Sequence, residues 1–193
     1  MTTTADRTRR TRRTGPARAP ATSPEGPQPG GQTVVLVVDA TDPAPARTLP
    51  AAAARLGTGD RLVVVVLHPP ARFTLNARLV AWQHTQRGRV AAAALAPLLT
   101  RIDRHGLLER GVRVHTLSCS YRRGWRPRPH RIAAALLRLC RDHHADQLVL
   151  AHGREAGLLT GDTHHQLTRL APTDLRIHLT TTPAPACTDR SRP

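Results

Sequence analysis

Three glycines, each four residues from the next, punctuate the stretch after a short apolar run near the end of the chain. The apolar run is Gln147 to Ala151, and a helix-like segment follows the last glycine. Backbone amides of glycine-rich loops that lead into helices bind anions such as phosphate groups. An arginine beside such a loop adds positive charge, whereas an aspartate repels phosphate. The candidate residues of this loop are Gly153, Arg154, Gly157, Gly161 and Asp162.

A second segment whose residue types could bind a ligand combines positive charge with aromatic rings. Residues 118–131 contain Tyr121, Trp125, His130 and five arginines, the densest such cluster in the folded part of the chain. Arginine binds nucleic-acid phosphates and an exposed aromatic ring stacks on a base. This predicts, as an alternative function, a nucleic-acid-associated protein in which the basic tail at the start of the chain and this loop both bind phosphate. The candidate nucleic-acid-binding residues are Arg122, Arg123, Trp125, Arg126 and Arg128.

Catalysis and metal binding find no support in the sequence. A G-x-S-x-G elbow, a Walker loop and a G-x-G-x-x-G motif are absent. Cys119, Cys140 and Cys187 follow no CxxC spacing. The pairs His143–His144 and His164–His165 are adjacent on helices, where neighbouring side chains diverge by about 100 degrees, so they are expected to be surface residues. We therefore expect a protein that is not an enzyme and binds no metal.

Strand-like and helix-like segments alternate along the chain and predict an α/β fold, with a three-layer doubly wound parallel sheet of five strands and helices on both faces. The expected strands are Thr33–Val38, Arg61–Leu67, Val112–Leu117, Gln147–Ala151 and Leu175–Leu179. The expected helices are Arg47–Leu56, Arg89–Glu109 with a bend at Pro97, Arg131–His144, and a last one capped by Asp162 that runs through Leu170. A partly helical excursion is expected over Ala71–Arg87.

The last of these segments also carry a family resemblance. The stretch ADQLVLAHGREAGLLTGDTHHQLTRLAPTDLRIHL resembles the carboxyl-terminal third of the universal stress protein family, whose members commonly read LIVMG-SRGRSGL, then GS, a helix and a final apolar strand. RHGLLERGVRV resembles the passage before the third strand of that family. The resemblance implies sheet order 3-2-1-4-5 and a stress-response or regulatory binding module. It also implies a ligand crevice between the first and fourth strands.

The phosphate end of this crevice departs from the family pattern. The family signature is G-x-x-G, about nine residues, then G-[S/T], which holds phosphates of a nucleotide. Here Ala151 and Arg154 replace the first two glycines, the loop is shorter, and Asp162 replaces the hydroxyl residue. Arg154 or Arg122 could supply compensating charge. The resemblance thus implies binding of ATP or another adenine nucleotide that is lost or altered.

The opposite end of the crevice keeps the family pattern. Asp39, followed by Ala40, matches the aspartate that the family associates with the adenine end of ATP. The alternative reading of Asp39 is a turn-forming residue at a strand end. Family members often form homodimers through the last strand, which here contains Arg176 and His178.

Composition sets the remaining expectations. The chain has 193 residues, a formal net charge of +16, and arginine as its only strongly basic residue type. Residues 1–32, with five arginines between Arg7 and Arg13, predict a disordered basic tail, residues 33–182 one domain, and residues 183–193 a frayed end. The charge favours nucleic acid or an acidic partner, against the alternative of a merely soluble surface. No apolar run is long enough to span a membrane, which predicts no membrane association and a cytoplasmic protein.

Overall fold

The computed structural model of the chain describes residues 31–42, 44–151 and 157–180. Its centre is a parallel sheet of five strands, because five runs rich in Val, Leu and Ile each provide one extended segment. The strands are β1 (Thr33–Asp39), β2 (Arg61–His68), β3 (Arg113–Ser120), β4 (Gln147–Ala151) and β5 (Arg176–Thr180). Their order in the sheet is β3-β2-β1-β4-β5, which confirms the order expected from the sequence.

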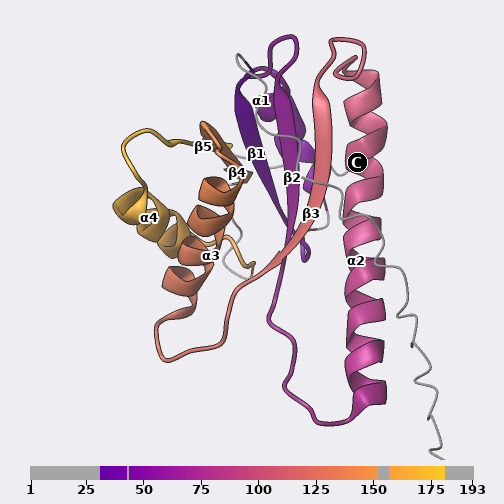
Figure 1. The fold of residues 1–193 in the computed structure, drawn as a ribbon, viewed down its shortest axis with the longest axis vertical. Coiled ribbons are helices and arrows are strands. Elements are labelled where there is room, and N and C mark those ends of the chain that lie inside the picture. Colours follow the sequence, from indigo (N-terminus) through magenta and orange to yellow (C-terminus); the bar gives the residue numbers. More distant parts are fainter. Residues whose placement is uncertain (1–30, 43, 152–156, 181–193) are drawn as a thin grey trace, which may run out of the picture.

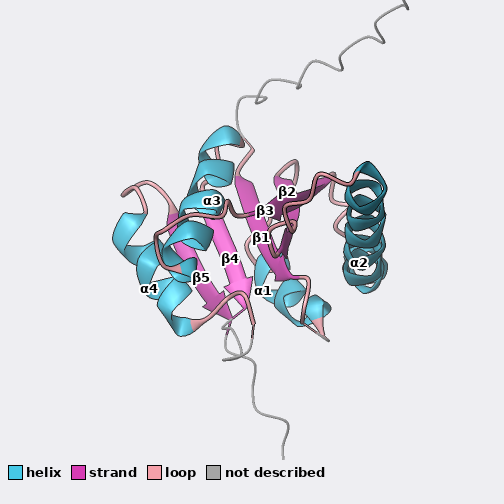
Figure 2. Cartoon of the chain, turned by 90° about the horizontal axis from the view of Figure 1, so that it is seen from below, coloured by secondary structure: helices cyan, strands magenta, loops and turns pink. Residues whose placement is uncertain are grey.

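Helices cover both faces of this sheet and complete the three layers (Figures 1 and 2). One face carries α1 and α2, and the other carries α3 and α4. The helices are η1, a 3₁₀ turn (Pro45–Thr48), α1 (Leu49–Ala53), α2 (Ala77–Arg104), α3 (Arg128–Asp142) and α4 (Gly161–Leu170). The doubly wound α/β fold class is therefore confirmed.

The core consists of two apolar layers, one on each side of the sheet. Successive side chains of a strand point to opposite faces, so each buried strand serves both layers. On β1, Val35 and Val37 pack with the layer that includes Ile132 of α3. Val34 and Leu36 pack with the layer that includes Leu98 of α2. Continuous apolar runs in β1 and β2 follow directly from burial on both faces.

Helix α2 differs from the sequence prediction. Most of the predicted excursion Ala71–Arg87 and of the predicted helix Arg89–Glu109 form one continuous helix of 28 residues, Ala77–Arg104, which contains Pro97. Residues 71–76 precede it without helical structure. Asn76 begins it, because the Asn76 Oδ1 atom accepts hydrogen bonds from the amides of Arg78 (3.0 Å) and Leu79 (3.3 Å). The helix ends before Glu109, since His105 caps it and Gly106 has a positive φ of 60°.

The other helices begin at different residues than predicted. The segment predicted as Arg47–Leu56 forms η1 and only a short α1. Helix α3 begins at Arg128 rather than Arg131, because a proline is tolerated within the first helical turn. The cap of α4 is Thr160 and not Asp162, which lies inside the first turn. The Thr160 Oγ1 atom accepts from the Thr163 amide at 3.4 Å.

The amino-terminal half of α2 extends past the sheet (Figure 1). The buried residues of this helix are Ala94, Leu98 and Ile102, all in its carboxyl-terminal half. Leu79, Val80 and Trp82 are exposed large apolar residues near its start. Within the described ranges, no helix is both long enough and apolar enough to cross a membrane.

Three predicted regions fall partly or wholly outside the described residues: residues 1–30 of the basic tail, residues 183–193, and residues 152–156 of the glycine loop. At the start of the described chain, the Gln32 amide donates to Asp60 Oδ1 at 2.8 Å. Gln32 is therefore anchored beside β1.

Val64, fully buried in β2, tests the placement of this strand. A Val64→Asp substitution should lower the free energy of unfolding by about 3 to 5 kcal/mol, because a buried carboxylate would have no partner. Thermal unfolding should then show a midpoint at least about 10 °C lower, or no folded protein. The control is Val90→Asp on the exposed side of α2, which should shift the midpoint little. A Val64→Asp protein that melts like the control would contradict a central β2.

Candidate ligand site at the carboxyl edge of the sheet

The carboxyl ends of β1 and β4 lie side by side where the sheet order reverses. These strands are hydrogen-bonded neighbours, with Val37 opposite Leu150, while their connections lead to opposite sides of the sheet. Open parallel sheets bind ligands outside the strand ends at such a point. Asp39 ends β1 and Ala151 ends β4, so both predicted residues do lie at this edge.

The Asp39 carboxylate is engaged by the protein itself. Asp39 is only 7% exposed. The Oδ2 atom accepts a hydrogen bond from the Leu158 amide at 2.5 Å. The Oδ1 atom accepts from the Thr41 amide at 2.8 Å and from the Thr41 hydroxyl at 2.7 Å. Three donors from two segments therefore satisfy a carboxylate that burial would otherwise destabilise.

The segment after the glycine loop folds inward over the end of β1. Leu158 and Leu159 are buried in the core layer that contains α3 and α4. The Thr163 hydroxyl donates to the Leu158 carbonyl at 3.2 Å, and Thr163 is itself buried. Thr160 then caps α4. We call this packed segment, residues 158–163, the Asp39 corner. The hydrogen bond from Leu158 to Asp39 links it to β1.

The other predicted ligand residues are more dispersed. Gly153 and Arg154 lie outside the described residues. The Gly157 carbonyl accepts from Arg128 NH2 at 3.1 Å, which ties the start of α3 to this loop. At Gly161 a Cβ atom would meet nothing within 4 Å among the described residues, so packing there does not require a glycine. Asp162 is exposed and lines a hollow toward α3 rather than adjoining Asp39 in the corner.

Sequence reasoning missed Leu158, Thr160 and His68. Leu158 contributes a backbone amide, which no side-chain pattern reveals, whereas Thr160 has the residue type of a helix cap and could have been chosen. His68 ends β2 and is 3% exposed, and its Nε2 atom has no hydrogen-bond partner among the described residues. Burial lowers the pKa of His68 from its ordinary value of 6.5, Arg87 lowers it further, and Asp39 opposes the shift. The imidazole is therefore neutral near pH 7.

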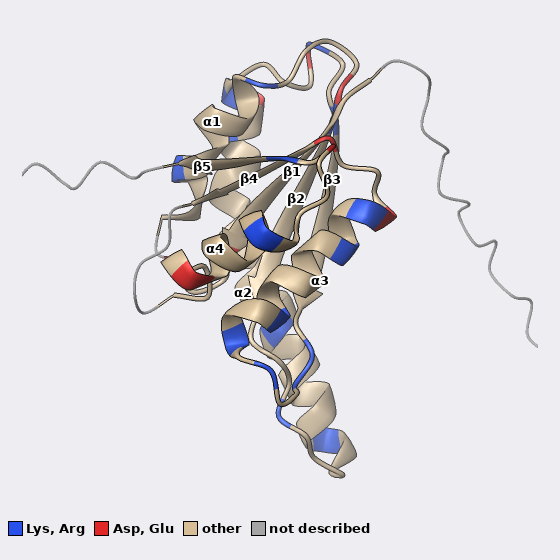
Figure 3. Cartoon of the chain, turned by 90° about the vertical axis from the view of Figure 1, so that its left-hand side faces the viewer, with Lys and Arg blue, Asp and Glu red and all other residues tan. Residues whose placement is uncertain are grey.

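The predicted nucleic-acid residues cluster on the connection between β3 and α3. Arg122, Arg123, Trp125 and Arg126 lie in this loop and are exposed, and Arg128 is the first residue of α3. Figure 3 shows arginines in blue on this loop and on the extending part of α2. This end of the molecule is consequently a strongly basic surface.

The cysteines and histidines form no metal site in the part of the chain that the structure describes, where no three side chains of His, Cys, Asp or Glu gather closely enough. Burial, assisted by nearby Cys119, raises the pKa of the Cys140 thiol to about 12. Cys140 is therefore an unreactive core thiol at neutral pH. Cys187 lies outside the described residues.

Strand β5 forms one edge of the sheet, where a homodimer was expected. Arg176 is exposed, and the His178 Nδ1 atom lies 3.2 Å from Arg55 NH2. Burial lowers the pKa of His178, and Arg55 and Arg176 lower it further. The edge is accessible, but pairing with a second copy stays a prediction.

No family model and no curated protein sequence matches the chain. Among solved structures, universal stress protein UspA from Lactobacillus plantarum is similar at 15% identity and a TM-score of 0.53, over 77% of this chain and 96% of that one. A universal stress protein family member from Burkholderia pseudomallei has 18% identity and a TM-score of 0.46, over 79% and 98%. One from Arabidopsis thaliana, with AMP bound, has 10% identity and a TM-score of 0.48, over 79% and 93%.

The sheet order and the similarity to UspA define the class of protein. The chain is a doubly wound α/β protein with the five-stranded order of UspA. The described residues have a UspA-like fold, which confirms at the level of the fold the resemblance drawn from the sequence.

The Asp39 corner should be measurable in stability. Asp39→Ala leaves the buried Leu158 amide without its acceptor, a loss of about 1 to 3 kcal/mol. The thermal midpoint should fall by about 3 to 10 °C. Asp174→Ala, which removes an exposed carboxylate before β5, is the control and should change the midpoint by less than about 2 °C. Equal midpoints for the two variants would show that Asp39 does not hold the corner.

The buried His68 predicts a pH dependence. The unfolded chain takes up a proton near pH 6.5, whereas the folded chain takes it up only at lower pH, since the pKa of His68 is lowered. The stability that neutral His68 contributes is therefore complete above about pH 6.5, the pKa of histidine in the unfolded chain, and decreases as the pH falls below it toward the lowered pKa of the folded chain. We expect the thermal midpoint to fall as the pH is lowered from 8 to 5, a range of about three units around the histidine pKa. This fall should be smaller for His68→Gln than for wild type. Exposed His165→Gln should retain the wild-type slope.

Proposed function

We propose that this protein is a non-catalytic, stress-response or regulatory binding module of the UspA type, in which binding of ATP at the sheet crevice is lost or altered. The observation that carries the proposal is the engagement of Asp39. The carboxylate that would accept a hydrogen bond from an adenine amine already accepts three from Leu158 and Thr41. Burial of Asp39 leaves little room for a ligand to add another.

The phosphate end supports the same proposal. Ala151 ends β4, so a side chain stands where the family signature has its first glycine. Asp162 lies in the first turn of α4, where the helix dipole favours an anion and where a bound phosphate would meet its carboxylate. The exposed Asp162 carboxylate at this helix start would therefore repel a phosphate group that approached it.

The absence of an enzymatic activity is part of the proposal. Asp39 is fully engaged, and His68 is buried behind the sheet edge on the α2 side. Neither group has the access that a general base needs to reach a substrate proton. A cytoplasmic location and a homodimer through β5 remain predictions of the sequence.

Nucleic-acid association is the second candidate function. The specific observation that favours it is a set of connected, arginine-lined hollows around the β3–α3 loop. This candidate is independent of the Asp39 crevice.

Calorimetric titration with ATP and with adenosine tests the leading proposal. Wild type should bind ATP no more tightly than about 1 mM and should not bind adenosine, because adenosine depends on the base end alone. Asp162→Ser removes a repelling charge and adds a donor, so affinity for ATP should rise about tenfold while adenosine stays unbound. Asp174→Ser removes the same charge at an exposed site elsewhere and should change neither titration.

The two ligands separate the possible failures. Micromolar binding of ATP by wild type would overturn the proposal of a lost site. Binding of adenosine by wild type would show that Asp39 reads the base in spite of its internal hydrogen bonds. An equal gain for Asp162→Ser and Asp174→Ser would show that general charge and not the α4 turn limits ATP binding.

A further inference from the structure

Three hollows on the surface meet at the loop between β3 and α3. The α2 hollow, about 330 Å³, lies beneath the start of α2 and includes Phe73. The α3–α4 hollow, about 600 Å³, lies between the starts of these two helices, and the β3–α3 hollow, about 630 Å³, runs along the free edge of β3. Arg123 lines the first and third, while Trp125 and Arg126 line the second and third. The hollows therefore form one connected surface path, which we call the arginine track.

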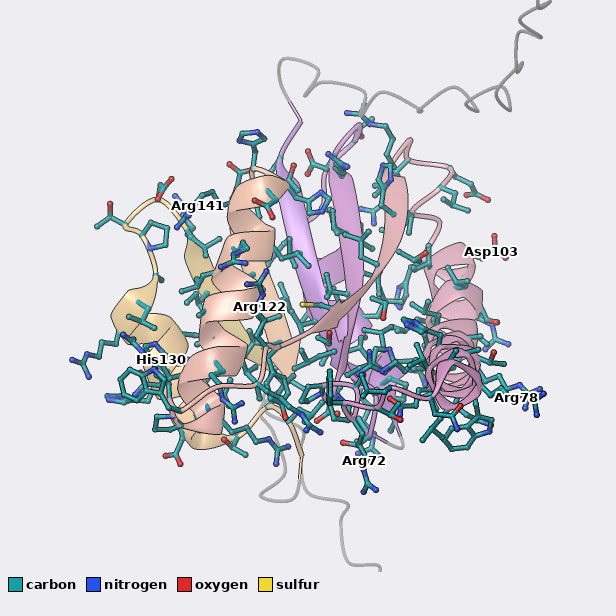
Figure 4. All side chains as sticks on the ribbon, turned by 60° about the horizontal axis from the view of Figure 1, so that its bottom comes forward. Arg72, Arg78, Asp103, Arg122, His130 and Arg141 are labelled. Carbon is teal, nitrogen blue, oxygen red and sulfur yellow. The ribbon has the colours of Figure 1, made fainter. Side chains whose placement is uncertain are left out.

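Positive charge dominates this track. The arginines that line it are Arg72, Arg87, Arg122, Arg123, Arg126, Arg131, Arg138 and Arg169. Among the residues that the structure describes, two acidic ones line it: Asp142 in the β3–α3 hollow and Asp162 in the α3–α4 hollow. In the sequence, residues 61–102 and 110–141 contain no Asp or Glu. In the view of Figure 4, Arg72 projects at the lower edge, below Arg122 and Arg78 on α2. Such an unbalanced surface attracts a polyanion.

Two exposed aromatic rings lie along the track on either side of Arg123. Trp125 is 90% exposed and Phe73 is 84% exposed. The Arg126 guanidinium lies over the Trp125 ring, 5.3 Å from its centroid, so the opposite face of the indole is free to stack. Aromatic rings among arginines bind single strands, because only unpaired bases offer their faces for stacking.

The basic side chains are available and their loop is held in place. The side chains of Arg122 and Arg123 are exposed. The Arg131 NH1 atom donates to the Arg122 carbonyl at 3.2 Å, and the Arg131 guanidinium lies 5.4 Å from the centroid of the buried Tyr121 ring. The loop is thus anchored at its ends while its arginines face solvent, which lowers the ordering cost of binding.

We infer that the arginine track binds single-stranded nucleic acid, with Arg122 and Arg123 on phosphates and Trp125 stacked on a base. The inference does not depend on the state of the adenine crevice. Leu79 and Trp82, exposed apolar residues beside the track, would suit an anionic membrane surface instead. The aromatic rings inside the hollows and the length of the connected path favour an extended strand, and the experiment separates the two partners.

Fluorescence anisotropy of a labelled single-stranded oligonucleotide, measured with the full chain at several salt concentrations, tests this inference. Affinity should fall with salt by about 0.7 logarithmic units per logarithmic unit of salt for each phosphate contacted. Arg123→Gln should reduce that slope by about one phosphate contact. Arg104→Gln, at the opposite end of α2, removes the same charge from an exposed site and should leave the slope unchanged.

Stacking has its own variants. Trp125→Ala should weaken binding about tenfold with an unchanged salt slope, and Trp125→Phe should restore most of the affinity. Trp125 is exposed, so thermal unfolding of both variants should match wild type. Failure to bind the oligonucleotide at low salt would overturn the inference, as would a duplex that binds more tightly. Binding to phosphatidylserine vesicles without oligonucleotide binding, or equal effects of Arg123→Gln and Arg104→Gln, would also overturn it.

Discussion

The hydrogen bond from the Leu158 amide to the Asp39 carboxylate joins the end of β1 to the segment that leads into α4. A buried carboxylate is stable only when its oxygens accept hydrogen bonds, so the chain must bring donors to the end of β1. Leu158 provides one of them and is itself fixed, since its carbonyl accepts from Thr163 at the start of α4. The position of α4, and the closure of the corner between β1 and β4, therefore depend on a single charged group.

The carboxyl edge of the sheet is closed in one part and open and basic in another. All five strands are parallel, so the loops after β2, β3 and β4 leave from one edge. Between β1 and β4 the edge is closed by leucines and by an engaged carboxylate. Beyond β2 and β3 it is open, basic and aromatic, with arginines that have no carboxylate to neutralise them nearby in sequence. The chain thus keeps the UspA-like sheet while its accessible chemistry lies beside the usual crevice.

Sequence patterns predicted the sheet well because burial on both faces demands long apolar runs, as in Thr33–Asp39 and Arg61–His68. They predicted α2 poorly, since its amino-terminal half packs on no strand and shows no apolar stripe of the usual kind. At the site, the residue type of Asp39 was evident but its partner was not. A backbone amide at Leu158 has no signature in the sequence, and the choice of Thr160 over Asp162 as cap depends on where the corner places the chain.

The central claim is that Asp39 serves the fold through Leu158 and is not available to a nucleotide. Nuclear magnetic resonance can follow the Leu158 amide directly in isotopically labelled protein. This amide should exchange with solvent as slowly as amides of the β1 core, and its resonance should stay unchanged when millimolar ATP, about the level that a weak site requires, is added. Fast exchange of the Leu158 amide, or a saturable shift of its resonance on addition of ATP, would contradict the account.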